Sequence, residues 1–465
     1  MNVPMGILIA TAILSLAAFS LRARSTLAAW IGAGGLLIVG LLIILLPLEE
    51  AVNLVGLPLK FESRFILLGR ALVVDQTTRG MVGLIYLMAA PILALSASVD
   101  ANRFFPALSI LLTGLLASAL MIRPFIYAAI LLELAAMLAV LILVAPEYPA
   151  RRSAMRLVFV YSLGMMAILL AGWLLEVVGV TGATPGTARW TAGLLALGFA
   201  VLMAIPPFHY WLSAAADESN PFLVAALLLQ LQTVGLFFLL QFLDAYEWLR
   251  LQQDVFRALR LVGMGMLWFG GVMSLGQRRM ARTIVYLMIA DMGVLVIAVG
   301  MGTVSGYEMA LQLGVARIPG MLIWAASAAG FIVREGDDLA ETLEGSAHRH
   351  SSLAIFLLLG LCSALGVPLT AVFPARWAML EFLGSLDPLA TLSLLLAWAW
   401  GAVVLLRWIF ILLRGRRDEK VRLDFSRAEI VLVTGAASIL LLGLLPQLLM
   451  PWVAFAGQGL PLLIP

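Results

Sequence analysis

The stretch LMAIPPFHYWLSAAADESNP, residues Leu202–Pro221, decides how the rest of this chain is interpreted. A long apolar run meets two consecutive prolines, Pro206 and Pro207, and aromatic residues follow directly. Two prolines remove two backbone donors and clash with carbonyls one turn back. Within a bilayer such a break survives only where the freed groups are buried in protein or line a wet cavity. The stretch therefore indicates either a broken helix at a transport site or a helix that kinks at its membrane exit beside an interfacial Trp belt.

The composition excludes a soluble globular protein. Hydrophobic residues make up 63% of the chain, charged residues make up 12%, and the mean hydropathy is +1.07. These values predict an all-α polytopic membrane protein. The single cysteine, Cys362, and three scattered histidines offer no disulfide framework, metal cage or haem site. We therefore expect no metal, no cofactor and no catalytic residue, and any redox chemistry is expected on another subunit.

Apolar runs of roughly 18–22 residues mark the membrane spans. We predict about fourteen transmembrane helices, of which the seventh and the twelfth are broken, the latter at GVPLTAVFP (366–374). The predicted spans are 3–21, 27–48, 81–98, 104–122, 124–144, 157–178, 191–212, 221–243, 258–276, 283–302, 307–333, 353–373, 388–413 and 428–451.

The distribution of Lys and Arg predicts the orientation. If the N-terminus faces outward, the inner loops hold 17 basic residues and the outer loops hold 9. Three of those nine lie mid-way in the long 49–79 loop, where charge says little about topology. Both termini are therefore expected on the extracytoplasmic side of a bacterial or archaeal plasma membrane.

A weak internal repeat organises the middle of the chain. The Pro207 break follows Glu133 by 74 residues, and the Pro368 break follows Asp291 by 77. Units of five spans must be inverted relative to one another, as in many secondary transporters. This predicts an N-terminal three-helix segment (1–98), two inverted five-helix repeats (104–243 and 258–413), and a C-terminal helix and tail (428–465).

Several polar residues fall within the predicted spans. A charge at the bilayer centre costs about 2.5–3.5 kcal/mol on insertion scales, so each of them needs a reason. They form either a proton path with water between its members, or pairs that join helices, such as Asp291 with Arg317. The candidates are Glu133, His209, Gln230, Gln232, Asp291, Arg317 and Arg376.

Lysine is nearly absent from this chain. Only Lys60 and Lys420 occur among 29 basic residues, and both lie outside the predicted spans. A buried lysine can exchange its proton, whereas an arginine guanidinium stays protonated. The chain therefore lacks the usual switchable cation of a proton relay.

Several segments resemble the antiporter-like membrane subunits of respiratory complex I, Mrp-type antiporters and membrane-bound hydrogenases. The segment PPFHYWLSAAADESNPFLVAALL is similar to the family signature PFHxWLPxAxxxxPxPVSALL. Four further segments resemble family motifs in the right order: LVVDQTTR (72–79), LLELAAML (131–138), QRRMARTIVYLMIADMG (277–293) and SALGVPLTAVFPARW (363–377). The resemblance covers spans three to twelve.

The chain departs from the family at the positions that the resemblance assigns to proton transfer. The family lysine five residues before the PFH proline is Leu202 here, and the twelfth-span lysine is Arg376. The eighth-span Lys or His is replaced by a stretch in which Gln230 is the polar residue. Asp291 stands at the tenth-span histidine, and Arg317 lies near the eleventh-span His/Lys pair. Of these residues only the glutamate, Glu133, is kept.

The resemblance implies an integral membrane subunit of a complex I-like, NADH-quinone oxidoreductase or hydrogenase-type proton-translocating complex. Loss of the family lysines weakens its own proton path. An alternative is a structural subunit that does not pump, and a third possibility is an Mrp-type cation/proton antiporter subunit. The expected partners are the other membrane subunits of such an assembly and the lipid bilayer, with no nucleic acid.

Overall fold

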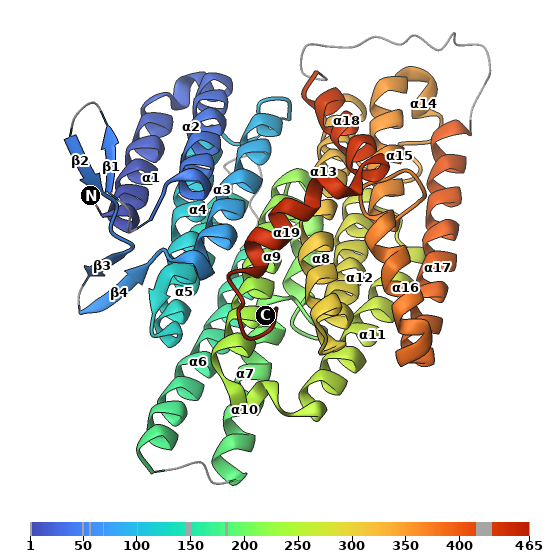
Figure 1. Cartoon of the computed structure of the whole chain (residues 1–465). Coiled ribbons are helices and arrows are strands. Elements are labelled where there is room, and N and C mark those ends of the chain that lie inside the picture. The colour runs from blue at the N-terminus through green and yellow to red at the C-terminus, as the bar shows by residue number, and fades with distance from the viewer. Residues whose placement is uncertain are drawn as a thin grey trace.

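The computed structural model describes residues 2–48, 51–54, 57–67, 69–99, 101–144, 151–181, 185–414 and 430–464. These residues form a bundle of long helices with a few short strands near the N-terminus (Figure 1). The prediction of an all-α polytopic architecture agrees with this bundle. The helices are α1 (Val3–Ser20), α2 (Ser25–Leu45), α3 (Gln76–Ser96), α4 (Phe105–Met121), α5 (Ala128–Leu143), α6 (Arg151–Thr181), α7 (Pro185–Leu202), α8 (Tyr210–Glu218), α9 (Pro221–Ala245), α10 (Glu247–Arg250), α11 (Gln253–Leu275), α12 (Met280–Gly300), α13 (Val304–Glu335), α14 (Ser346–Arg349), α15 (Ser351–Leu365), α16 (Phe373–Leu386), α17 (Pro388–Leu413), α18 (Ile430–Leu444) and α19 (Met450–Gly457).

Ten helices of the described part are long and apolar enough to cross a membrane. They are α1, α2, α3, α5, α6, α9, α11, α12, α13 and α17. The helix α18 and the segment that ends with α19 meet at a bend of 101° and form a further candidate. Three shorter apolar helices, α4, α7 and α15, complete the set.

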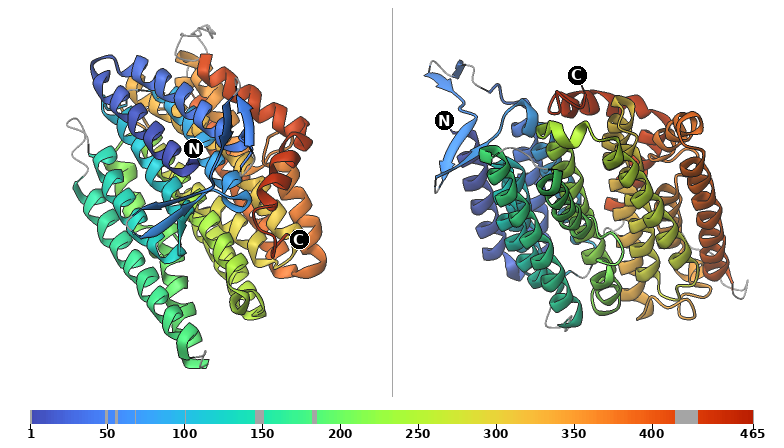
Figure 2. Two further views of the ribbon diagram at one scale, coloured as in Figure 1. Left: turned by 60° about the vertical axis from the view of Figure 1, so that its left-hand side comes forward. Right: turned by 90° about the horizontal axis from the view of Figure 1, so that it is seen from below.

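Helix α9 lies at the centre of the bundle. Its apolar stretch is buried over its whole length, and that of α12 is buried over 94%. Helices α1–α5 lie on one side of α9 and helices α11–α17 on the other (Figures 1 and 2). The outer helices α1 and α17 bury only 28% of their apolar stretches. Their exposed leucines and isoleucines suit contact with lipid chains or with a neighbouring membrane protein.

Glycines bring α11 and α12 into backbone contact. A Cβ on Gly293 of α12 would lie 2.6 Å from the carbonyl oxygen of Gly263 on α11, so a larger residue does not fit there. Small residues at such crossings let membrane helices approach closely. This packing fixes α12, which carries Asp291.

The 49–79 segment contains two antiparallel hairpins where the sequence was interpreted as a loop. Strand β1 (Ala51–Leu54) pairs with β2 (Leu57–Lys60), and β3 (Arg64–Leu67) pairs with β4 (Arg70–Val73). The two-residue strand β5 (Ile122–Arg123) extends the second hairpin. Strands of four residues are too short to stand out in a search for long apolar runs.

Two of the differences between the helix ends and the predicted spans lie in the C-terminal third of the chain. The twelfth span was expected over 353–373 with a break at 366–374; α15 does end at Leu365, but α16 continues beyond the expected span to Leu386. The last span was expected over 428–451, but α18 ends at Leu444 before the bend. In both regions Gly or Pro lies inside an apolar run and ends the helix without changing the hydropathy.

Candidate functional site

The first helix break separates α7 from α8. Helix α7 ends at Leu202, and Ala204 adopts a left-handed conformation with φ of 56° ahead of the two prolines. Trp211, on α8, is fully buried in the protein. The carbonyl of Met203 lies beyond the last helical turn, and it accepts a hydrogen bond of 3.3 Å from the side-chain nitrogen of Gln232 on α9. The freed backbone group is therefore satisfied by protein, as the bilayer requires.

The second helix break separates α15 from α16. Gly366 caps α15 in a left-handed conformation with φ of 68°. The backbone N–H of the next residue, Val367, donates a hydrogen bond to the carbonyl oxygen of Cys362. The chain then passes through Leu369, which also has a positive φ of 73°. Helix α16 begins at Phe373, so Arg376 lies in its first turn, next to the break.

An ion-pair chain occupies the space between these breaks. The Asp291 carboxylate on α12 accepts a hydrogen bond of 3.1 Å from Nη1 of Arg317 on α13. Its other oxygen accepts a bond of 2.6 Å from Nη2 of Arg376 on α16. Nη2 of Arg317 donates to the Gln232 amide oxygen at 3.1 Å. The Asp291–Arg317 pair expected from the sequence is thus present, and Arg376 joins it.

The result is a continuous run of polar contacts from one break to the other. It passes from the Met203 carbonyl through Gln232, Arg317 and Asp291 to Arg376. The exposed fractions of Asp291, Arg317 and Arg376 are 2%, 1% and 8%. Breaking a buried ion pair by removing one partner costs about 3–5 kcal/mol, so this triad strongly constrains how α12, α13 and α16 pack.

Three other predicted site residues do not take part in this run of polar contacts. Glu133 on α5 is only half-buried, and one of its oxygens accepts a hydrogen bond of 2.5 Å from Ser162 on α6. His209 packs against the ring of Phe269, with 4.6 Å between centroids. Gln230 is buried, but it lies two residues from Gln232 and therefore on another face of α9.

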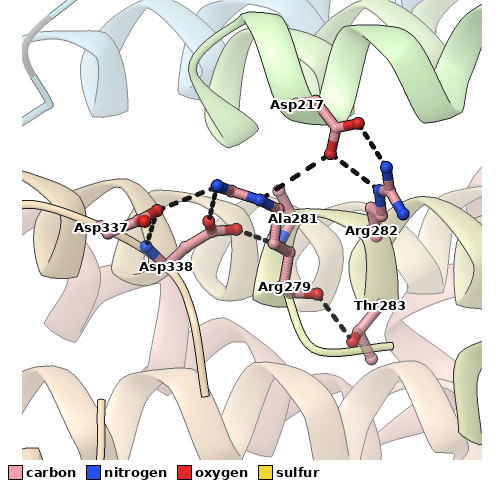
Figure 3. Close-up of polar contacts among 7 residues, drawn as sticks. All are labelled: Asp217, Arg279, Ala281, Arg282, Thr283, Asp337 and Asp338. Atoms are coloured by element: carbon pink, nitrogen blue, oxygen red, sulfur yellow. Dashed lines mark hydrogen bonds and ion pairs between the residues drawn. The ribbon is translucent and has the colours of Figure 1, made fainter. Parts of the chain in front are cut away.

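A second polar cluster, which was not predicted from the sequence, links α8, the start of α12 and the segment after α13 (Figure 3). Asp217 near the end of α8 binds Arg282 of α12 through both carboxylate oxygens, at 2.7 and 2.5 Å. Arg279 binds Asp337 at 2.9 Å and Asp338 at 2.7 Å in the segment after α13. These contacts join the second half of the first broken helix to the start of α12.

Asp338 is the buried member of this second cluster. Its exposed fraction is 2%, and its second carboxylate oxygen accepts a hydrogen bond of 2.8 Å from the backbone N–H of Ala281. Burial raises the pKa of the Asp338 carboxyl above its ordinary value, which the backbone bond and Arg279 partly oppose. Arg279 and Arg282 were counted from the sequence only as inner-loop charges, because no spacing pattern links them to acids more than fifty residues away.

Replacing Gly366 by alanine is expected to destabilise the second break. The positive φ favours glycine, and an added Cβ would lie 2.9 Å from Cδ of Arg376. We expect a loss of about 1–3 kcal/mol, measured as a lower melting temperature of the purified protein. The control is Gly265→Ala in α11, where a Cβ meets nothing within 4 Å. Equal melting temperatures for the two variants would show that the left-handed conformation and close packing of Gly366 do not stabilise the second break.

Comparisons with known proteins place the chain in a family. The family profile described as "NADH:quinone oxidoreductase/Mrp antiporter, TM" matches residues 126–399, which include all seven predicted site residues. The NADH-quinone oxidoreductase subunit N of Acidithiobacillus ferrooxidans is 27% identical over 277 residues, covering 57% of this chain and 56% of that protein. The chain therefore spans about half the length of the curated relatives it matches.

Solved structures share the fold over nearly the whole chain. A chain of respiratory complex I from Thermus thermophilus with bound NADH has a TM-score of 0.76 at 20% identity, covering 97% of this chain and 99% of that chain. A chain of the archaeal membrane-bound sulfane sulfur reductase has a TM-score of 0.77 at 16% identity, with coverages of 99% and 96%. On the family match, this chain belongs to the transmembrane family of NADH:quinone oxidoreductase and Mrp antiporter subunits.

Proposed function

We propose that this chain is an antiporter-like membrane subunit of a complex I-type oxidoreductase whose own proton path is interrupted at the Arg317–Asp291–Arg376 triad. The observation that carries the proposal is the position of Asp291 between two guanidinium groups. Within the complex the subunit then serves to hold the membrane arm together. Proton translocation is assigned to other subunits of the same assembly.

The geometry of the triad supports an interrupted path. Each oxygen of the Asp291 carboxylate already accepts a hydrogen bond from an arginine, at 3.1 and 2.6 Å. Neither arginine can release a proton, because a guanidinium stays protonated in proteins. A proton that reaches the triad therefore has no side chain there that passes it on.

The first break supports the same interpretation. Leu202, at the position where the family resemblance implies a lysine, is buried at the end of α7 with an exposed fraction of 1%. The polar side chain at this break is Gln232, whose amide is neutral and does not take up or release a proton. The described contact at this end of the run, between Gln232 and the Met203 carbonyl, therefore contains no ionisable side chain.

A proton-conducting role remains the second candidate, and Glu133 is the residue that favours it. One of its carboxylate oxygens is buried without a hydrogen-bond partner among the described residues, so an internal water is the group that would satisfy it. Ionisable residues inside membrane spans often mark proton paths, which makes Glu133 the candidate for a conducting residue.

Glu133→Gln decides between the two candidates. Glutamine keeps the size of the side chain and an oxygen for the Ser162 hydroxyl, so assembly should be normal. We expect an unchanged proton-to-electron ratio in vesicles that contain the intact complex. Glu381→Gln on α16, whose carboxylate binds Nε1 of Trp377, is the matched control. A lower proton-to-electron ratio in Glu133→Gln but not in Glu381→Gln would show that Glu133 belongs to a conducting path, and it would overturn the proposal.

We further propose fourteen spans with two inverted repeats. The number is the sum of the ten long helices, α4, α18 and the two broken pairs α7–α8 and α15–α16, with each pair counted as one span. The proposed partners are the neighbouring membrane subunits, which would contact the exposed apolar faces of the outer helices. Mass spectrometry of the proteins that co-purify with the chain tests this assignment directly.

The orientation gives a separate prediction. Reporter fusions at Gly415, which lies outside the described residues together with the basic residues that follow it, should report a cytoplasmic position. Fusions at the C-terminus should report an extracytoplasmic one, because the inner loops hold the excess of basic residues. A cytoplasmic C-terminus would contradict both the topology and the inverted repeat.

A further inference from the structure

The triad is not electrically neutral. Arg317 and Arg376 contribute two positive charges and Asp291 contributes one negative charge, and all three side chains are buried. The other buried charged side chain of the described part is Asp338, which binds Arg279 at the end of the bundle. One positive charge therefore remains in the apolar core, where an uncompensated ion costs several kcal/mol.

Three acids of the surrounding helices bind groups outside the triad. Glu133 of α5 accepts its described bond from Ser162 on α6. Glu381, on the same helix as Arg376, accepts from Nε1 of Trp377. Asp387, at the start of α17, binds Arg260 of α11 at 3.1 Å. None of these contacts places a second carboxylate on the triad.

Both arginines keep an unused donor. Nε of Arg317 and Nε of Arg376 are buried and have no acceptor among the described residues. A guanidinium offers five N–H groups and no acceptor, so only an oxygen or an anion can satisfy these atoms. Of the two arginines, Arg376 also lines a small cavity, where the excess charge favours an anion.

A small cavity lies beside the triad. Its volume is about 30 Å³, and Asp291 and Arg376 are its charged lining residues. The remaining wall is apolar and includes Leu365, Ala397 and Trp398. This is room for one small ion or a single water, but not for a phosphate or a carboxylate metabolite. Apart from the indole N–H of Trp398, the wall side chains offer no donor that would compete with the guanidinium.

We propose that this cavity binds a small monovalent anion of the halide class, which neutralises the excess charge of the triad. The anion would lie against the guanidinium of Arg376, in the cavity that Asp291 also lines. The site would stabilise the packing of α12, α15 and α16 whether or not the subunit conducts protons. The inference is therefore independent of the proposed function.

The first test measures melting of the full chain, purified with the subunits that accompany it. The protein is compared in chloride, in bromide and in gluconate at constant ionic strength. We expect a saturable rise in melting temperature of about 2–4 °C with either halide. Arg376→Gln leaves a neutral Asp291–Arg317 pair and should abolish this rise, whereas Arg376→Lys should keep it.

The control is Arg278→Gln, because Arg278 is exposed and pairs loosely with Glu341 at 3.9 Å. This variant should respond to halide as the native protein does. Absence of a halide effect on the native protein, or the same effect in Arg376→Gln, would overturn the proposal.

A second test does not depend on any variant. Anomalous diffraction from crystals of the native protein grown in bromide should give a peak next to the guanidinium of Arg376. A bromide map with no peak at the triad would overturn the proposal, even if the melting temperature rises with halide.

Discussion

Asp291→Asn is expected to cause the largest loss of stability of any single change in the central site. Asparagine keeps the shape of the side chain but removes the negative charge, and it leaves Arg317 and Arg376 facing one another in the core. The net charge of the triad rises from one to two. Removing one partner of a buried pair costs about 3–5 kcal/mol, so little assembled protein should remain in the membrane.

Three comparisons make this prediction specific. Arg317→Gln keeps a neutral pair between Asp291 and Arg376 and should be milder. Asp217→Asn removes a partly exposed ion-pair partner at the end of the bundle and should cost about 1 kcal/mol or less. Yield and melting temperature of the purified protein are the measurements. Native yield of Asp291→Asn would show that the triad does not hold the core together.

Much of the architecture could be predicted from the sequence. Apolar runs located the long helices, and the Pro206–Pro207 pair located the first break, because hydropathy and proline chemistry are local properties. The Asp291–Arg317 pair could also be predicted, since two opposite charges on adjacent spans rarely stay apart in a bilayer. The family resemblance was confirmed by the match over residues 126–399.

The rest depends on packing between distant segments. Arg376, in the first turn after the second break, contacts Asp291 although the two residues are 85 positions apart in the sequence. Gln232 was a candidate on its own, but the Met203 carbonyl as its partner follows from how α9 passes the end of α7. Glu133 was expected inside a span, and the structure places it on a half-buried face of α5. This could not be predicted, because hydropathy does not distinguish a helix face that contacts protein from one that contacts lipid.

The last prediction concerns Arg376, which connects the second break to the triad. Arg376→Ala removes a side chain that packs against Gly366 and leaves one oxygen of Asp291 without its donor. The cavity and the lost hydrogen bond together should cost about 2–4 kcal/mol, seen as a lower yield of the complex. Arg376→Lys keeps the charge and one hydrogen bond, and its yield should be close to native.

The proton-to-electron ratio then distinguishes a structural arginine from a conducting one. In vesicles that contain equal amounts of assembled complex, Arg376→Ala should pump with the native ratio, because the triad passes no protons in the native protein either. A variant that assembles normally but pumps fewer protons per electron would reverse this assignment. Arg376 would then hold water or charge in a working channel, since its own proton stays bound at any physiological pH.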